Sequence, residues 1–373
     1  MRYCQRCVLP DSRPGLELGP DGVCSACRQH VVKQTAIDWR AREAQLGQIV
    51  QEVRALDRRY DCVIPVSGGK DSTWQTARCL EAGLHPLAVT WRTPGRTELG
   101  QANLDNLIAM GVDHVDFTIN PEVEKRFLVK AFERYGTTAI PMHLAIFNVP
   151  LTIAARYEIP LVVWGEDSAS EYVGVDVDPD AFALDSRWVE RFGAVHGTTA
   201  ADWVDDDLSA RDLTPYAGPS DDELAAAGIR AVFLGYFLEW DPAETARVAA
   251  EHGFSAAAAP RTGVYDYADV DDDFISLHHF LKWHKFGFTR SWDNLSLEIR
   301  NGRLTRDEAI AVLRQTGDET PAADIERFCE YVDRPTGWFY EVCERFRDPE
   351  IWSVRDDAPV IEDFLISDWD WSR

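Results

Sequence analysis

Short apolar runs alternate along the first two thirds of the chain with stretches of helical periodicity. The runs of strand length cover residues 60–66, 85–91, 114–119, 159–164 and 229–235, and helical patterns cover residues 73–80, 100–110 and 144–157. Strands that alternate with such helices predict an α/β fold with a doubly wound parallel sheet, which binds its ligand at the carboxyl ends of the strands. Gly83 is expected to end the first of these helices.

The pattern divides the chain into three regions. Residues 55–270 form the predicted α/β domain, and residues 1–45 precede it as a turn-rich, cysteine-containing segment. Residues 271–373 are helical in pattern without clear strands. Near residues 200–223 the α/β pattern is interrupted by an acidic stretch rich in proline and glycine, which indicates a solvated insertion rather than core.

Composition and charge narrow the class of protein. The 373 residues are 45% hydrophobic and carry a net charge of −25, so the chain builds a core but lacks the basic surface that a nucleic-acid binder needs. No apolar run approaches the length of a membrane span, and no targeting signal stands at the start. We therefore expect a cytoplasmic protein that binds neither nucleic acid nor membrane.

Four of the eight cysteines lie within the first 27 residues. Cys4, Cys7, Cys24 and Cys27 form two CxxC pairs at the spacing of a structural zinc site. The turn-rich residues between the pairs cannot form a core of their own, so a metal would supply their folding energy. Four thiolates leave no open coordination position, which favours structural over catalytic zinc.

A glycine-rich turn follows the first predicted strand. The sequence Ser67-Gly68-Gly69-Lys70-Asp71-Ser72 lies between that strand and a helix, where backbone N–H groups and the helix dipole attract an anion. The Walker A spacing is not met, so a kinase or GTPase loop is disfavoured. The same sheet-edge argument selects Thr90, Trp91 and the run Gly165-Glu166-Asp167 at the ends of two other strands.

The SGGKDS sequence resembles the signature of the PP-loop ATP pyrophosphatases. The resemblance implies ATP and Mg²⁺ as cofactors, an adenylated intermediate and release of pyrophosphate. It further implies that Gly68 and Gly69 offer N–H groups, that Ser67 and Ser72 add hydroxyls, that Lys70 neutralises phosphate charge and that Asp71 helps to hold Mg²⁺. Because the net negative charge of the chain would repel ATP, the hypothesis of ATP binding requires a basic lining around residues 67–72.

Several further motifs together resemble the N-acetyl sugar amidotransferases, PP-loop enzymes of surface-polysaccharide synthesis. They run from Tyr3-Cys4 and Asp21-Gly22-Val23-Cys24 through Asp38-Trp39-Arg40, Thr97-Glu98-Leu99-Gly100 and Trp164-Gly165-Glu166 to Lys285-Phe286-Gly287-Phe288 and Glu298-Ile299-Arg300. The family commonly has Gly-Glu-Asn-Pro where this chain has Gly165-Glu166-Asp167-Ser168. The resemblance implies that an acetamido oxygen of a nucleotide-linked sugar is adenylated and that ammonia then displaces AMP.

Candidate residues for this chemistry follow from the motifs. Lys70, Asp71, Glu166 and Asp167 are the catalytic candidates, with Glu166 and Asp167 positioning Mg²⁺ or ammonia. The candidates for binding phosphate or substrate are Thr97, Asn103, Glu171, Lys282, Lys285, Arg290 and Arg300. Lys282 and Lys285 share a predicted helix face and, with Lys70, are three of only six lysines. His278, His279 and His284 lack a complete ligand spacing and are expected to be packed or surface histidines rather than a metal site.

The source of ammonia and three alternative functions remain open at this point. None of Cys62, Cys79, Cys329 and Cys343 has the flanking residues of a glutaminase nucleophile, so we expect a separate glutaminase subunit or use of free ammonia. The alternatives are a PP-loop sulfur transferase, an amidating enzyme of natural-product assembly, and a zinc-stabilised module that binds ATP as a signal.

Overall fold

A parallel sheet of five strands lies at the centre of the chain. A computed structural model describes residues 1–166, 169–174, 182–316 and 319–371. The strand order is β3-β2-β1-β4-β5, and every pairing is parallel. The bounds are β1 (Cys62–Pro65), β2 (Pro86–Trp91), β3 (Asp113–Phe117), β4 (Leu161–Trp164) and β5 (Arg230–Phe233).

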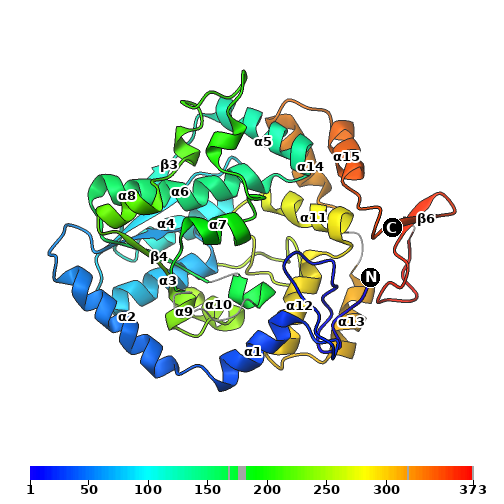
Figure 1. The fold of residues 1–373 in the computed structure, drawn as a ribbon, viewed down its shortest axis with the longest axis horizontal. Coiled ribbons are helices and arrows are strands. Elements are labelled where there is room, and N and C mark those ends of the chain that lie inside the picture. The colour runs from blue at the N-terminus through cyan, green and yellow to red at the C-terminus, as the bar shows by residue number, and fades with distance from the viewer. Residues whose placement is uncertain (167–168, 175–181, 317–318, 372–373) are drawn as a thin grey trace.

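Helices cover both faces of the sheet (Figure 1), as the predicted doubly wound fold requires. One face packs against the helices α2 (Trp39–Arg54), α3 (Lys70–Glu81), α4 (Glu98–Ile108) and α10 (Pro242–Glu251). The other packs against α6 (Ala139–Tyr157), α7 (Ser186–Phe192) and α8 (Asp221–Ala226). Successive side chains of β1 point to opposite faces of the sheet, so Ile64 belongs to the first core and Val63 to the second. The fold class predicted from the sequence is confirmed.

The loop that carries SGGKDS lies where the strand order reverses. β1 pairs with β2 on one side and with β4 on the other, so the segments after β1 and β4 meet at the topological switch point. The expected helix after β1 is α3, and Gly83 follows it with a φ of +78° and donates its N–H to the Leu80 carbonyl. The segment after β4 begins with Gly165 and Glu166.

Helix α6 is long and apolar enough to cross a membrane by length and composition. It has 19 residues, and its most apolar stretch of 18 has a mean hydropathy of 1.2, so the expectation that no run approaches the length of a membrane span was wrong. However, 61% of that stretch is buried inside the fold. Its apolar side chains pack against β1, β2 and β4 in the second core. These contacts identify α6 as a core helix of the α/β domain.

The acidic stretch near residues 200–223 contributes to the core after all. Its acidic side chains are largely exposed as expected, but Trp203, Leu208, Leu213 and Tyr216 are buried beside Phe127 of α5 (Pro121–Tyr135). Trp203 ends the short 3-10 turn η2 (Ala200–Trp203), and Tyr216 ends the second one, η3 (Thr214–Tyr216). The prediction of a solvated insertion rather than core was wrong, because apolar residues spaced among the charged ones pack into the core.

The carboxyl-terminal region is helical, as predicted. Its helices are α11 (Ile275–Phe286), α12 (Arg290–Arg300), α13 (Arg306–Gln315), α14 (Ala322–Tyr331) and α15 (Thr336–Arg345). A short antiparallel hairpin of β6 (Ser353–Arg355) and β7 (Ala358–Val360) follows, which the expectation of no strands had excluded. Such three-residue strands are too short for a pattern of alternation to reveal.

The amino-terminal segment packs on this helical region. Both ends of the chain lie on the same side of the molecule, the N-terminus near α13 and the C-terminus near β6 (Figure 1). The four cysteines share a core with Trp292, Leu313 and Ile366, and the Arg306 guanidinium donates to the Cys7 carbonyl at 3.0 Å. Helix α1 (Ser25–Thr35) then leads along the molecule to α2. The remaining elements are α9 (Leu234–Phe237), which directly follows β5, and a π-helical turn η1 (Ala169–Val173).

Candidate active site

The SGGKDS residues line a cavity of about 170 Å³ at the switch point. We call it the loop cavity; its lining includes Ser67, Gly69, Lys70, Asp71 and Ser72. Gly68 lies behind them with a φ of +90°, and a Cβ atom there would stand 2.7 Å from the Leu104 backbone nitrogen. Glycine is therefore required for the close approach of the loop to α4. Among the described residues, no side chain caps α3 at Gly69, which leaves the first turn of that helix open to an anion.

Lys70 and Asp71 are held together on the wall of the loop cavity. Lys70 Nζ lies 2.6 Å from Asp71 Oδ2 and donates to Thr245 Oγ1 at 3.3 Å. Trp240 Nε1 donates to the other carboxylate oxygen of Asp71 at 3.0 Å, and its ring lies 5.4 Å from Lys70 Nζ. The charged pair is thus fixed by residues from the start of α10, far away in sequence.

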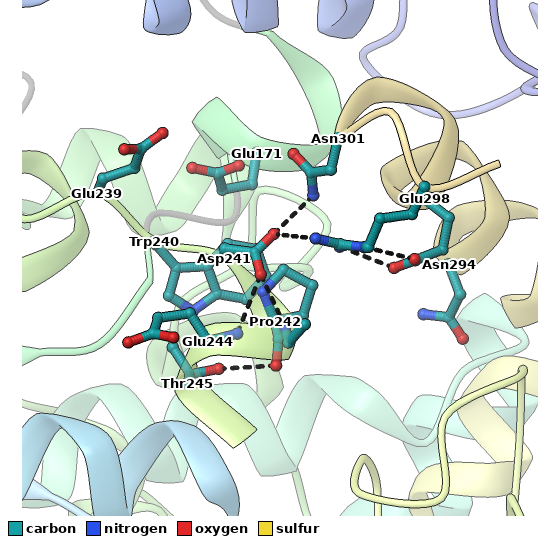
Figure 2. A network of polar contacts seen from close by, with 12 residues as sticks. Glu171, Glu239, Trp240, Asp241, Pro242, Glu244, Thr245, Asn294, Glu298 and Asn301 are labelled. Carbon is teal, nitrogen blue, oxygen red and sulfur yellow. Dashed lines mark hydrogen bonds and ion pairs between the residues drawn. The ribbon is translucent and has the colours of Figure 1, made fainter. Parts of the chain in front are cut away.

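A network of polar contacts anchors Trp240 and α10 to the carboxyl-terminal helices (Figure 2). Asp241 caps α10 by accepting the N–H groups of Ala243 and Glu244. Its second oxygen accepts Asn301 Nδ2 and Arg303 Nη1, both at 2.8 Å. Arg303 is in turn paired with Glu298 at 2.6 Å. The residues that orient Asp71 are therefore tied to α12.

Four carboxylates and two cations line the described part of the loop cavity. Asp71, Glu166, Asp269 and Asp271 face Lys70 and Arg290. Burial and the nearby charge of Asp71 raise the pKa of Glu166 to about 7, against the opposing charge of Lys70. Burial likewise raises the pKa of Asp271. The basic lining expected around residues 67–72 is present only as these two cations, and the excess of carboxylate oxygens is the donor set that Mg²⁺ prefers.

A second cavity of about 710 Å³ adjoins the first; we call it the large cavity. The two share Glu166, Tyr172, Asp269 and Arg290 in their linings. Five cations line the described wall of the large cavity against three carboxylates; the cations are Arg13, Arg191, Lys282, Lys285 and Arg290. The basic lining that was predicted around residues 67–72 is therefore not found in the described lining of the loop cavity, where carboxylates outnumber cations, and an excess of cations occurs in the adjoining large cavity instead.

Some of the predicted site residues line the two cavities, and others lie elsewhere. Lys282, Lys285 and Arg290 line the large cavity, and Lys70, Asp71 and Glu166 line the loop cavity. Asp167 lies outside the described residues. The candidates absent from the described linings of both cavities are Gly68, Thr90, Trp91, Thr97, Asn103, Gly165, Glu171 and Arg300.

Most of these absent candidates have structural contacts instead. Thr97 caps α4 by accepting the Gly100 N–H, and Asn103 exchanges two hydrogen bonds with the Ser255 backbone. Glu171 forms an ion pair with Lys33 at 2.7 Å, and Arg300 donates to the Glu171 carbonyl. Thr90 donates to the Val66 carbonyl at 2.8 Å. In the described structure these side chains therefore contact protein groups rather than either cavity.

Sequence reasoning missed several residues that line the cavities. Tyr172, Trp240, Tyr265, Tyr267, Asp269 and Asp271 surround the loop cavity, and Arg13 reaches the large cavity from the cysteine segment. No spacing rule connects residues so distant along the chain. His278 and His279 also line the large cavity, but burial lowers the pKa of each well below its ordinary value, as expected of packed, neutral histidines.

The four amino-terminal cysteines converge as the zinc motif predicts. All four are fully buried, and their sulfur atoms lie within 4.8 Å of one another. Cys7 Sγ is 3.7 Å from Cys24 Sγ, and Cys4 Sγ is 4.0 Å from Cys27 Sγ. Zinc–sulfur bonds of about 2.3 Å in a tetrahedron place sulfurs about 3.8 Å apart. The donor set and its spacing therefore fit a structural zinc ion.

Comparison with solved structures finds matches at low similarity. NMN synthetase from Francisella tularensis is 12% identical with a TM-score of 0.35, over 80% of this chain and 94% of that one. A predicted subunit of tRNA methyltransferase from Methanocaldococcus jannaschii is 13% identical with a TM-score of 0.32, over 62% and 91%. NAD+ synthetase from Burkholderia pseudomallei is 15% identical with a TM-score of 0.26, over 61% and 94%.

The family comparison concerns the carboxyl-terminal part of the chain. No curated protein matches the chain. Residues 262–364 match the family model described as "LPS biosynthesis protein WbpG-like, C-terminal domain". The match begins just before Asp269 and Asp271 and includes Lys282, Lys285 and Arg290. The predicted resemblance to a family of surface-polysaccharide synthesis is confirmed: residues 262–364 are similar to the carboxyl-terminal domain of the WbpG-like lipopolysaccharide biosynthesis proteins.

Proposed function

We propose that this chain is an ATP-dependent amidotransferase. It adenylates the oxygen of an acetamido or carboxyl group on a small acceptor, for which a nucleotide sugar is the best candidate, and installs ammonia with release of AMP and pyrophosphate. The observation that carries the proposal is the shared wall of the two cavities. A triphosphate in the loop cavity would meet an acceptor in the large cavity at Glu166, Tyr172, Asp269 and Arg290.

The chemistry balances with ATP and ammonia as the co-substrates. The amide oxygen of the acceptor attacks the α-phosphorus of ATP, the bond from that phosphorus to the bridging oxygen breaks, and pyrophosphate leaves. Loss of the amide proton gives an O-adenylyl imidate. Ammonia then adds to the imidate carbon and AMP leaves with the former amide oxygen, so that an amidine is formed. Adenylation is needed because an amide oxygen is a poor leaving group.

The loop residues have the properties that such a step needs. The uncapped start of α3 offers N–H groups, and Lys70 offers positive charge to the departing pyrophosphate. Asp71 and the neighbouring carboxylates would hold Mg²⁺, which neutralises phosphate charge when bound. Glu166 lies between the cavities, where a carboxylate can position ammonia beside the activated carbon. Arg290 borders both cavities and would contact either phosphate chain.

Sulfur transfer fits the structure less well than nitrogen transfer. Cys62 and Cys79 are buried in the core beneath β1, and Cys329 and Cys343 in the core of α14 and α15. None of the four is among the described residues that line either cavity. A persulfide on any of them would be shielded from the acceptor. Replacing the four by serine should therefore leave the reaction intact, apart from any loss of stability.

The direct test is a pyrophosphate-release screen with the purified chain, ammonia and a panel of acetamido compounds that includes nucleotide sugars. We expect release that requires both ATP and one acceptor, with AMP formed in equal amount. Asp71→Asn should abolish release, whereas Asp241→Asn should only weaken it, because Asp241 acts through Trp240. Release that is independent of any acceptor, or no release with any of them, contradicts the proposal.

The source of nitrogen needs a separate measurement. Because no lone cysteine is placed as a nucleophile in either described cavity, we propose that a separate glutaminase subunit supplies ammonia. Ammonium chloride should therefore support turnover by the single chain, while glutamine alone should not. Turnover of glutamine by the single chain would overturn this part of the proposal. We also propose a cytoplasmic location for the protein, because ATP and nucleotide sugars occur there.

A further inference from the structure

The cysteine segment (residues 1–27) reaches the wall of the large cavity. Arg13, Pro14 and Gly15, which lie between the two CxxC pairs, are part of its lining. The turn that carries them is fixed at both ends. Ser12 Oγ donates to the Phe286 carbonyl at 2.6 Å, and Gly15 packs so closely on Val173 that an added Cβ would stand 3.0 Å from its Cγ1 atom. A metal-binding segment therefore delivers a guanidinium group to this cavity.

Asp293 organises the cations on that wall from behind. Its carboxylate is fully buried and is not itself among the described lining residues. Arg13 Nε lies 2.8 Å from Asp293 Oδ1, Lys282 Nζ lies 2.8 Å from Asp293 Oδ2, and Arg290 Nη1 lies 4.0 Å from that second oxygen. Although its burial acts to raise it, the pKa of Asp293 is held well below its ordinary value by Lys282, Arg13 and Arg290. One carboxylate thus gathers three cations from three different segments.

The cluster has more positive charge than Asp293 can balance. With Asp269 beside Arg290, three cations meet two carboxylates, and the neighbouring His278 and His279 are neutral because burial lowers the pKa of each. Arg290 Nε is buried and has no hydrogen-bond partner in the described part of the chain, with an Asp269 oxygen 3.7 Å away. Arg13 and Arg290 both lie over the ring of Tyr172, at 5.8 and 5.4 Å. Oriented cations that outnumber the carboxylates beside them on a cavity wall favour the binding of an anion.

We propose that Arg13, Lys282 and Arg290 form the anion subsite of the large cavity and bind the diphosphate group of the acceptor. The cysteine segment then has a role in substrate binding besides its own folding: it holds Arg13 in place on Asp293. This inference rests on the proposed function, because it takes the large cavity as the acceptor site. It adds the residues that select a diphosphate-linked acceptor over a neutral acetamido sugar.

A purely structural role for Arg13 gives different expectations. If Arg13 only anchors the cysteine segment to α12, its loss lowers the melting temperature and the zinc content and leaves anion affinity unchanged. If Arg13 belongs to the subsite, its loss weakens anion binding while melting temperature and zinc content change little. Arg6 offers a matched control, because it is an exposed arginine of the same segment and is not among the described residues of the large cavity.

The experiment is a calorimetric titration with inorganic pyrophosphate. The full-length protein is first saturated with Mg²⁺ and a non-hydrolysable ATP analogue so that the loop cavity is filled. We expect the wild-type protein to bind a further equivalent of pyrophosphate. Arg13→Gln should weaken that binding at least tenfold, Arg13→Lys by a smaller factor, and Arg6→Gln by less than twofold. Zinc content and melting temperature are measured on each variant.

Each outcome decides the proposal. The absence of a further pyrophosphate site in the wild-type protein overturns it, and so does equal affinity in the Arg13→Gln and Arg6→Gln variants. Should Arg13→Gln lose zinc or unfold, the Arg13→Lys variant decides: wild-type affinity there, with a wild-type melting temperature, overturns the proposal. Failure of the ATP analogue to bind in the first titration counts against the proposed function, and comparison of pyrophosphate binding by wild type, Arg13→Gln and Arg6→Gln then still decides the subsite. Where turnover is found, Arg13→Gln should raise the KM for the acceptor and leave the KM for ATP unchanged.

Discussion

At the scale of single residues, Asp71 shows how a contiguous motif depends on distant side chains. One oxygen of its carboxylate lies beside Lys70 and the other accepts the indole N–H of Trp240. A carboxylate that is fixed at both oxygens presents a defined direction to a metal ion, so less ordering remains to be done when Mg²⁺ binds. Trp240 is therefore a positioning residue rather than a catalytic one.

The Trp240→Phe variant tests this positioning role. Phenylalanine keeps an aromatic ring beside Lys70 but cannot donate to Asp71, and a hydrogen bond to a charged group contributes about 1.5–3 kcal/mol. We expect the Mg²⁺ concentration for half-maximal pyrophosphate release to rise about tenfold, with a smaller change at saturating Mg²⁺. Trp188→Phe, an indole of the second core, serves as the control for ring substitution. An unchanged Mg²⁺ dependence in Trp240→Phe would show that Asp71 does not need this donor.

Two adjacent glycines give a second residue-scale test. Gly68 has a φ of +90°, and its Cβ would meet backbone atoms of Gly100 and Leu104 at 2.8 and 2.7 Å. At Gly69 the nearest atom to a Cβ is Ser67 Oγ at 3.3 Å. Gly68→Ala should therefore destabilise the fold by about 2 kcal/mol, from the strained conformation alone, and displace the loop. Gly69→Ala should cost much less, and urea unfolding with ATP-analogue titration separates the two.

The residues of the site differ in how far sequence could predict them. Ser67, Lys70 and Asp71 were predictable because one strand–turn–helix unit places them together. Arg13, Trp240 and Asp271 were not, because three separate segments bring them to the same cavities only after folding. Thr97 and Asn103 were predicted to bind phosphate or substrate, and in the structure both have contacts within the protein. They occur in a recognisable motif, yet the first caps α4 and the second ties it to the Ser255 backbone.

At the scale of elements, burial decides which parts of the fold a pattern reveals. The five strands of the sheet were predicted because most are apolar on both faces, and β-branched runs bounded by turns rarely form anything else. The end of β5 was misplaced, because the apolar run continues into helix α9 without a change of pattern. Helix α5 was not predicted from the sequence, where it lies between two elements with a clearer pattern. The stretch near residues 200–223 was misjudged because its charges outnumber the four apolar side chains that are buried.

Helix α5 includes an acidic residue whose burial predicts a pH dependence of stability. Glu124 is only 4% exposed, and burial raises its pKa from 4.5 to about 7. The pKa of Glu124 is therefore higher in the folded chain than in the unfolded chain, so proton binding by Glu124 contributes to folding stability. This contribution is fully present below about pH 4.5 and is lost as the pH rises through 7. The shift corresponds to a loss of about 3 kcal/mol at high pH.

Glu124→Gln should remove this dependence and keep a group that can accept from Tyr331, whose hydroxyl lies 3.1 Å from the Glu124 carboxylate. Urea unfolding at pH 5 and pH 8 should show the variant gaining stability relative to wild type as the pH rises. Glu122→Gln changes the same charge at an exposed position of the same helix and should follow wild type. Parallel curves for Glu124→Gln and wild type would mean that Glu124 is ionised in the fold at both pH values.

At the scale of the whole molecule, the negative charge is distributed so that anions still have a place to bind. A net charge of −25 keeps most of the surface acidic, whereas the described wall of the large cavity has two more cations than carboxylates. The loop cavity is the reverse, with an excess of carboxylates that calls for divalent cations. Under the proposed function, an ATP–Mg²⁺ complex and an anionic acceptor would therefore have separate surroundings on either side of Arg290 and Glu166.

The cysteine cluster joins the two ends of the chain, which predicts what loss of its metal does. Its core is shared with α12, α13 and residues 364–369, and the same segment holds Arg13 on Asp293. Treatment with a zinc chelator should lower the melting temperature and release one zinc ion per chain. Four thiols should become reactive, because the other four cysteines stay buried in separate cores.

Chelation should also separate the two binding functions. The α/β sheet and helix α3, which begins at the glycine-rich loop, pack in cores that contain none of the four clustered cysteines, so binding of the ATP analogue should persist. Binding of pyrophosphate in the large cavity should fall at least as far as in Arg13→Gln, since the turn that carries Arg13 loses its support. Equal loss of both affinities would show that the metal instead stabilises the whole chain. Retention of both would show that contacts such as Arg306 with the Cys7 carbonyl hold the segment without a metal.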